Sequence, residues 1–184
     1  MVCRIFQTIL KKFSKLFAGD FGGTLDLVNL LALSMDGVRS RIGKCDAIFV
    51  VGGHTDYLMH VYNSTGFSKV LPELLENKVY MGSSAGSMVL GQRVSTDAYA
   101  RIYGEPNNYG VGDYLGLVDF AIKPHMNSVN WPNNRAEVLE DASRGLGFDV
   151  YGIQDTTAIC IDDTRRYIVG SEPYIIKTAS GGRQ

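Results

Sequence analysis

A short apolar run followed at once by Gly, Ser and Ala is the feature that most limits the folds open to this 184-residue chain. Val79, Tyr80 and Met81 have side chains typical of a strand, and residues 82–86 read Gly-Ser-Ser-Ala-Gly. Small side chains on both sides of Ser84 let the backbone turn sharply out of the strand. We therefore predict a strand, a tight turn and a helix in succession, with Ser84 exposed at the turn.

Strand-like and helix-like segments alternate along the chain. Predicted strands cover residues 47–51, 79–81, 117–122, 150–153, 158–161, 166–169 and 174–177. Predicted helices cover residues 4–17, 36–44, 55–62, 67–75 (with Asn77 as its cap), 87–92 and 133–143 (with an Asn cap). Residues 25–33 fit either a buried strand or a helix, and residues 95–113, rich in Tyr, Gly and Asn, indicate a loop. This alternation favours an α/β fold with a mostly parallel sheet, in a single domain over residues 1–184.

Composition narrows the class of protein. The chain is 45% hydrophobic and 20% charged with a net charge of −1, values typical of a globular protein that binds no nucleic acid. Its three cysteines lack the spacing of metal ligands, so we expect no metal or cofactor and a cytoplasmic location. The basic amphipathic helix predicted over residues 4–17 packs on the sheet or rests on a membrane surface, and no apolar run is long enough for stable membrane insertion.

The turn at residues 82–86 matches the pattern G-x-S-x-G, which exposes a serine hydroxyl above a sheet edge. Ser84 is therefore the candidate nucleophile, with Ser83 as its less favourably placed neighbour. The helix that follows directs its free amides toward this position, so the amide of Ala85 is a candidate oxyanion donor. Gly53 follows the other strongly apolar strand and is the candidate for the second donor. Each turn, taken alone, also fits an ordinary connection without chemistry.

A serine nucleophile needs a base, and the chain has only His54, His60 and His125. His125 follows the predicted strand 117–122, where parallel sheets place their ligand-facing loops. Asp155 follows the next predicted strand and is the candidate acid that orients the imidazole. The resulting order Ser, His, Asp differs from the order Ser, acid, His of the α/β-hydrolases, which we set aside.

Four segments in this order resemble the peptidase E family of serine peptidases (family S51), to which cyanophycinase is more distantly related. They are residues 50–55, 82–86, 117–125 and 152–155, within a resemblance that covers about residues 46–178. The resemblance implies a three-layer flavodoxin-like sandwich like that of the class I glutamine amidotransferases. It also implies that Ser84 is the nucleophile, His125 the base, and Gly53 and Ala85 the oxyanion donors. Asp155 stands where the family carries a Glu.

Peptidase E hydrolyses dipeptides with an N-terminal aspartate and holds that side chain with an Arg, for which Arg135 is the candidate here. Two positions depart from the family's pattern: His54 replaces an Asn and alters the substrate pocket, and Ser83 replaces a Trp. The chain also lacks room for the family's usual N-terminal strands. We therefore expect a rearranged sheet or an exposed edge, in a monomer or a homodimer.

The leading hypothesis is a cytoplasmic serine peptidase that hydrolyses small peptides through an acyl-enzyme without a cofactor. One alternative is a catalytically inactive or truncated family member that acts as a binding protein. Another is an enzyme of the same mechanism that acts on a different small peptide or amide.

Overall fold

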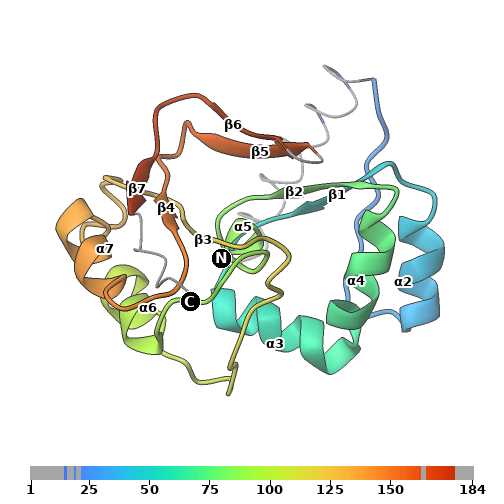
Figure 1. Ribbon diagram of the computed structural model, residues 1–184. Helices are drawn as coiled ribbons and strands as arrows, with labels where there is room; N and C mark the ends of the chain where they lie inside the picture. Colours follow the sequence, from blue (N-terminus) through green and yellow to red (C-terminus); the bar gives the residue numbers. More distant parts are fainter. Residues whose placement is uncertain (1–14, 16–18, 20–21, 163–164, 177–184) are drawn as a thin grey trace, which may run out of the picture. The chain divides into compact units, whose positions relative to one another are not determined.

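The computed structural model describes residue 15, residue 19, residues 22–162 and residues 165–176 (Figure 1). The helix predicted over residues 4–17 lies, apart from Lys15, outside these residues. The chain divides into two compact units, Met1–Lys44 and Cys45–Gln184. A single domain over residues 1–184 stays a prediction.

In the first unit, α2 (Met35–Ile42) confirms the helix predicted over residues 36–44. Residues 25–33 form neither the buried strand nor the helix that we predicted. Leu25 and Leu31 are 40% and 61% exposed. The side chain of Asn29 accepts the amide hydrogen of Leu31 at 3.0 Å. This local bond favours a turn over a regular element, and apolar composition alone could not reveal it.

The second unit contains the remaining elements. Its described helices are α3 (Thr55–Thr65), α4 (Phe67–Leu75), α5 (Ala85–Met88), α6 (Thr96–Tyr103) and α7 (Ala136–Ala142). Its described strands are β1 (Ala47–Val50), β2 (Val79–Gly82), β3 (Ala121–Lys123), β4 (Val150–Gly152), β5 (Ala158–Asp162), β6 (Arg165–Val169) and β7 (Tyr174–Ile176). Every strand predicted from the sequence is present, and α4 has the predicted bounds.

Several predicted bounds in this unit were wrong. The loop predicted over residues 95–113 contains α6, because Ser95 caps its first turn and Gly104 ends it in the left-handed conformation. The strand predicted over residues 117–122 is regular only in β3, and the helix predicted over residues 87–92 is α5, which begins earlier.

Two predicted helix caps were also wrong. The helix predicted over residues 133–143 begins later, at α7, with Arg135 rather than an Asn as its cap. Glu76, not Asn77, caps the end of α4.

The sheets of the second unit are short and mixed. Among the described residues, β1 pairs with β2 in parallel, with Ala47 opposite Val79, and β3 pairs with β4 in parallel. Strand β7 extends β4 in the antiparallel sense, and β5 and β6 form a separate antiparallel pair. The fold is therefore mixed α/β, as predicted, with less parallel pairing than predicted. The three-layer flavodoxin-like arrangement stays a prediction.

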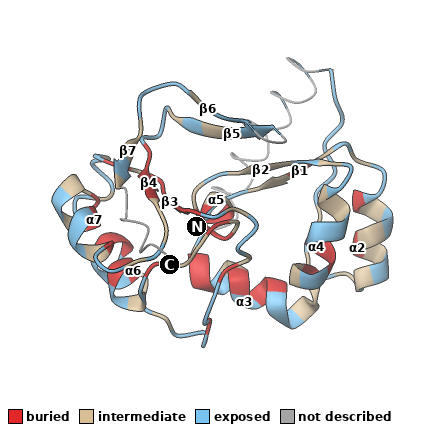
Figure 2. Cartoon of the chain, in the orientation of Figure 1, coloured by how far each residue is buried: buried red, intermediate tan, exposed pale blue. Residues whose placement is uncertain are grey.

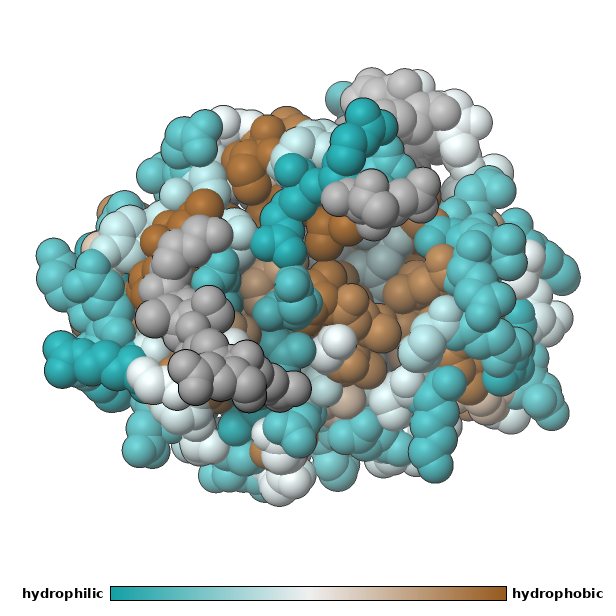
Figure 3. Space-filling model, viewed as in Figure 1, coloured by the Kyte–Doolittle hydropathy of each residue, from teal (hydrophilic) through white to brown (hydrophobic). Residues whose placement is uncertain are grey.

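The core of this unit lies around β3 and β4. Phe120, Ile122, Tyr151 and Ile153 form one buried apolar cluster, and their two-residue spacing places them on one face of the two strands. Figure 2 shows the buried residues gathered on these strands and on the adjoining helices. On α7, Leu139 is buried while Glu137, Glu140 and Asp141 are exposed, and Figure 3 shows a largely hydrophilic surface on this side of the unit. The end of β3 that leads to His125 is thus fixed by packing.

None of the helices in the described part of the chain is long and apolar enough to cross a bilayer.

Candidate active site

Ser84 occupies a strained turn between β2 and α5. Its backbone angles are φ 55° and ψ −122°, outside the regions that a non-glycine residue ordinarily adopts. The amide of Ser83 donates to the carbonyl of Val50 at 2.9 Å, which ties the turn to β1. A Cβ on Gly86 would lie only 2.3 Å from the same carbonyl oxygen, so glycine is required for this close approach. The turn therefore has the geometry predicted from G-x-S-x-G.

The structure brings Ser84, His125 and Asp155 together from three separate segments. Nε2 of His125 lies 2.8 Å from Oγ of Ser84, and Nδ1 lies 2.5 Å from Oδ1 of Asp155. With the proton on Nδ1, the imidazole donates to Asp155 and accepts from the serine hydroxyl. The side chain of His125 is 23% exposed and that of Asp155 is 57% exposed. This is the arrangement of a nucleophile, a base and an orienting acid.

The loop that carries His125 is held by contacts that the sequence did not reveal. Trp131 stacks on the imidazole with ring centroids 5.8 Å apart. The carbonyl of Pro124 accepts hydrogen bonds from Nδ2 of Asn134 and from the hydroxyl of Tyr103. His125 has φ 67°, and such local strain persists only where surrounding contacts enforce it.

Both candidate oxyanion donors have free amides. Within the described part of the chain, neither the amide of Gly53 nor that of Ala85 donates to a protein acceptor. Gly52 lies directly against the serine, since a Cβ added there would stand 2.7 Å from Cβ of Ser84 and 3.0 Å from its Oγ. The Gly52-Gly53 loop and the first turn of α5 therefore both adjoin Ser84.

The two predicted substrate-binding residues have structural contacts of their own. His54 caps α3, since its Nδ1 accepts from the amide of Tyr57 at 3.3 Å. The guanidinium of Arg135 donates to the carbonyls of Asn134 and Trp131 at 3.0 and 3.2 Å. Contact of either side chain with substrate stays a prediction.

A pocket of about 190 Å³ opens beside the three side chains, all of which line it. Ser83, Ser87, Gln154 and Thr157 supply its other polar walls, and isoleucines supply most of the apolar ones. Among the described residues, no lysine or arginine lines it. The pocket therefore adjoins the predicted nucleophile, and Asp155 is the only charged carboxylate among its described lining residues.

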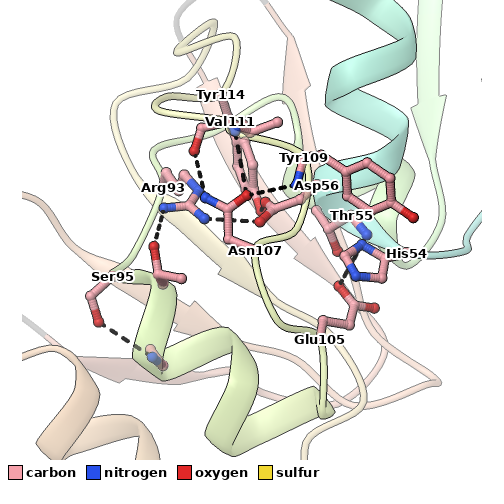
Figure 4. A network of polar contacts seen from close by, with 12 residues as sticks. His54, Thr55, Asp56, Arg93, Ser95, Glu105, Asn107, Tyr109, Val111 and Tyr114 are labelled. Carbon is pink, nitrogen blue, oxygen red and sulfur yellow. Dashed lines mark hydrogen bonds and ion pairs between the residues drawn. The ribbon is translucent and has the colours of Figure 1, made fainter.

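A buried ion pair joins the first turn of α3 to the segment after α5 (Figure 4). Asp56 on α3 accepts from Nη2 of Arg93 at 3.0 Å and from the hydroxyl of Tyr114 at 2.9 Å, and its side chain is 2% exposed. Burial alone would lower the pKa of Arg93, but the hydrogen bond and charge of Asp56 outweigh it and raise that pKa.

Lys123 is a buried lysine, two residues before His125. Its Nζ lies 3.4 Å from the ring centroid of Tyr99 and has no hydrogen-bond partner in the described structure. Burial lowers the pKa of Lys123 well below its usual value, and the charge of Arg93 adds to this effect.

Sequence reasoning missed Trp131 and the pairing of Asp56 with Arg93. Nothing in the local sequence marks either, because each contact joins residues that only the fold brings together. Sequence analysis also assigned no role to Glu105, whose carboxylate accepts from the amide of Thr55 at the start of α3. No group of three or more His, Cys, Asp or Glu side chains in the described part of the chain could hold a metal ion.

Comparison with known proteins shows the family of the chain. Residues 2–169 match the model of peptidase family S51. An uncharacterised peptidase of Listeria innocua, Lin0382, is 30% identical over 80% of this chain and 66% of its own length. Peptidase E of a Nostoc species is 30% identical over 96% of this chain and 72% of its own length. The chain thus spans about two thirds to three quarters of these relatives.

Two solved structures have a fold similar to that of this chain. A putative peptidase E protein of Listeria monocytogenes has a TM-score of 0.68 at 22% identity and matches 83% of this chain and 73% of its own. A peptidase from an acI-B1 actinobacterium has a TM-score of 0.63 at 17% identity and matches 94% of this chain and 74% of its own. The family match covers most of the sequence, and it includes the strand, turn and loop segments that bring Ser84, His125 and Asp155 together. The chain therefore belongs to peptidase family S51.

Proposed function

We propose that this protein is a serine peptidase that hydrolyses small peptides, with Ser84 as nucleophile, His125 as base and Asp155 as orienting acid. The observation that carries the proposal is the unbroken contact from Ser84 Oγ through the imidazole to Asp155, at 2.8 and 2.5 Å. Membership of a peptidase family and the strained turn at Ser84 support the same assignment.

In the proposed reaction, Oγ of Ser84 attacks the peptide carbonyl carbon while Nε2 of His125 takes the hydroxyl proton. The carbonyl oxygen becomes an oxyanion that accepts from the amides of Gly53 and Ala85. The imidazolium then protonates the leaving amine as the C–N bond breaks, which leaves an acyl-enzyme. A water molecule gives its proton to His125, attacks the acyl carbon, and releases the acid as Ser84 regains its proton.

Recognition of an N-terminal aspartate is the finer part of the proposal. Arg135 would hold the substrate carboxylate, for which its guanidinium must exchange its contacts with the carbonyls of Trp131 and Asn134. The small volume of the pocket supports a short peptide over a long one. His54 would line the same side of the site, next to Gly53.

A panel of dipeptides with Asp, Asn, Glu or Leu as first residue tests both parts. We expect wild-type protein to cleave at least one, and Ser84→Ala to lower kcat by about 10⁴-fold or more, because it removes the nucleophile. Ser83→Ala is the matched control and should keep activity. A preference for Asp over Asn supports the role of Arg135.

Undiminished turnover in Ser84→Ala would refute the mechanism. Folded wild-type protein that cleaves nothing would instead favour an inactive, binding member of the family.

A further inference from the structure

Gly53 supplies a proposed oxyanion amide, yet among the described residues no side chain packs against the position its own side chain would take. The residue is exposed, has φ 145°, and would have no heavy atom within 4 Å of an added Cβ. A catalytic donor must be held close to its productive position, because a displacement of about 1 Å can cost about a hundredfold in rate. The restraint on Gly53 must therefore come from the segments on either side of it.

The first turn of α3 follows Gly53. The amide of Thr55, at the start of this turn, bonds to a side chain from a distant part of the sequence (Figure 4). The amide of Thr55 donates to Oε2 of Glu105 at 3.0 Å, across 50 residues of chain. The carboxylate also lies 3.9 Å from Nδ1 of His54, and its side chain is only 13% exposed. A carboxylate at this end of a helix satisfies an otherwise unpaired donor and complements the helix dipole.

Backbone contacts at the end of α6 restrain Glu105. Gly104 ends α6 in the left-handed conformation, and the amide of Glu105 donates back to the carbonyl of Tyr99 at 3.5 Å. The start of α6 is joined to the segment after α5 because Nη1 of Arg93 donates to the hydroxyl of Thr96 at 3.1 Å. The carboxylate is thus connected to the same segment that follows the predicted nucleophile.

We propose that Glu105 is a positioning residue: its hydrogen bond to the amide of Thr55 holds the first turn of α3, and with it the amide of Gly53, where an oxyanion forms. This inference rests on the proposed function and deepens it. Glu105 touches neither the substrate nor the reacting atoms. It acts through the helix that follows Gly53, with the adjacent Asp56–Arg93 ion pair as the buried anchor of the same turn.

The experiment compares Glu105→Ala, which removes the acceptor, with Glu105→Gln, whose amide oxygen can still accept from Thr55. Exposed Glu172→Ala serves as the control for loss of a carboxylate elsewhere. Each variant is assayed with the best dipeptide of the panel and with the matching peptide aldehyde. The aldehyde forms a tetrahedral adduct with the serine and so reports on the oxyanion site. Circular dichroism checks that each variant is folded.

We expect Glu105→Ala to lower kcat by about 10- to 100-fold, less than the full loss of one oxyanion donor. KM should stay within about threefold, since the lost contact matters only in the transition state. The aldehyde should bind more weakly by a factor similar to the loss in kcat/KM. Glu105→Gln should recover most of the lost kcat and most of the lost aldehyde binding. The pH dependence of kcat/KM should keep the same midpoint in all variants. If the Ala variant does not fold, Glu105→Asp replaces it, because its shorter side chain loses the bond.

Three results would overturn the inference. One is a Glu105→Ala enzyme with wild-type kcat, and another is an equal loss in the Ala and Gln variants. The third is a loss of kcat without weaker binding of the aldehyde, which would indicate a merely structural effect. Inactive wild-type protein would instead overturn the proposed function, and the inference with it.

Discussion

Two carboxylates of the second unit each bond to a basic side chain near the predicted nucleophile, and the two pairs differ in their exposure to solvent. Asp56 and Arg93 are 2% and 8% exposed, with the carboxylate also bonded to Tyr114. Asp155 and His125 are 57% and 23% exposed, with only 2.5 Å between the two atoms that meet. The first pair joins α3 to the segment after α5, and the second lies at the edge where the pocket opens.

Burial determines how much each pair contributes to the free energy of unfolding. A buried charge that loses its partner cannot be solvated, so the Asp56–Arg93 pair is costly to break and ties its segments firmly. An exposed pair contributes little to stability because water solvates either partner alone. The buried pair therefore contributes to the stability of the fold, whereas the exposed pair keeps the proposed proton-transfer groups in contact with solvent.

The largest expected effect is the difference in stability between variants that break the two pairs one at a time. Asp56→Ala should lower the free energy of unfolding by about 3–5 kcal/mol, because it strands the Arg93 guanidinium. Asp155→Ala should lower it by less than about 1 kcal/mol, while it lowers kcat if Asp155 orients the imidazole. Urea denaturation and dipeptide hydrolysis measure the two effects. Similar stability losses in both variants would contradict the contrast.

A substitution at Gly52 examines the contact between the Gly52-Gly53 loop and the nucleophile. Gly52→Ala places a Cβ 2.7 Å from Cβ of Ser84, so one of the two segments must shift. We expect kcat/KM to fall by about a hundredfold, the cost of a displacement near 1 Å. Gly112→Ala is the matched control, since a Cβ there meets nothing within 4 Å. Equal activity in the two variants would show that the loop tolerates the shift.

The smallest expected effect is that of Lys123, the buried lysine near the Asp56–Arg93 pair. Because its folded-state pKa is lowered, the unfolded chain holds the extra proton at any pH between the folded pKa and about 10.4. Stability from this group therefore rises with pH through that window. Relative to wild type, Lys123→Met should be more stable at pH 7, and its advantage should shrink by pH 9.5.

Thermal unfolding at the two pH values measures this difference, with exposed Lys69→Met as control. An advantage that does not change with pH would mean that Lys123 is protonated in the folded protein.

Local sequence predicted the parts of the fold that local forces determine. The strands at β1 and β2 follow from β-branched and aromatic runs that end in glycine, and α4 follows from its apolar spacing. Helix α6 was missed because its Tyr-rich composition and the Gly and Asn that follow suggested a loop. Its cap, Ser95, and its terminal Gly104 were visible in the sequence and would have marked both ends.

The candidate site also contains residues that the sequence predicted and residues that only the structure revealed. Ser84, His125 and Asp155 were predictable because each follows a predicted strand, and strand ends gather at one edge of the parallel sheet that we expected. The structure brings them together although, among the described residues, β2 lies in a different sheet from β3 and β4. Glu105, Trp131 and the Asp56–Arg93 pair were not predictable as supports. Each acts on a residue that only the folded chain brings near, so no spacing along the sequence records the contact.

The most direct measurement for the central claim is the site at which a fluorophosphonate attaches, read by mass spectrometry of the digested protein. The probe bonds to a serine oxygen that a nearby base has activated, and Ser84 is 2.8 Å from Nε2 of His125. We predict one adduct, on Ser84, that is lost in His125→Ala and kept in Ser83→Ala. An adduct on Ser83, or none on folded wild-type protein, would contradict the account.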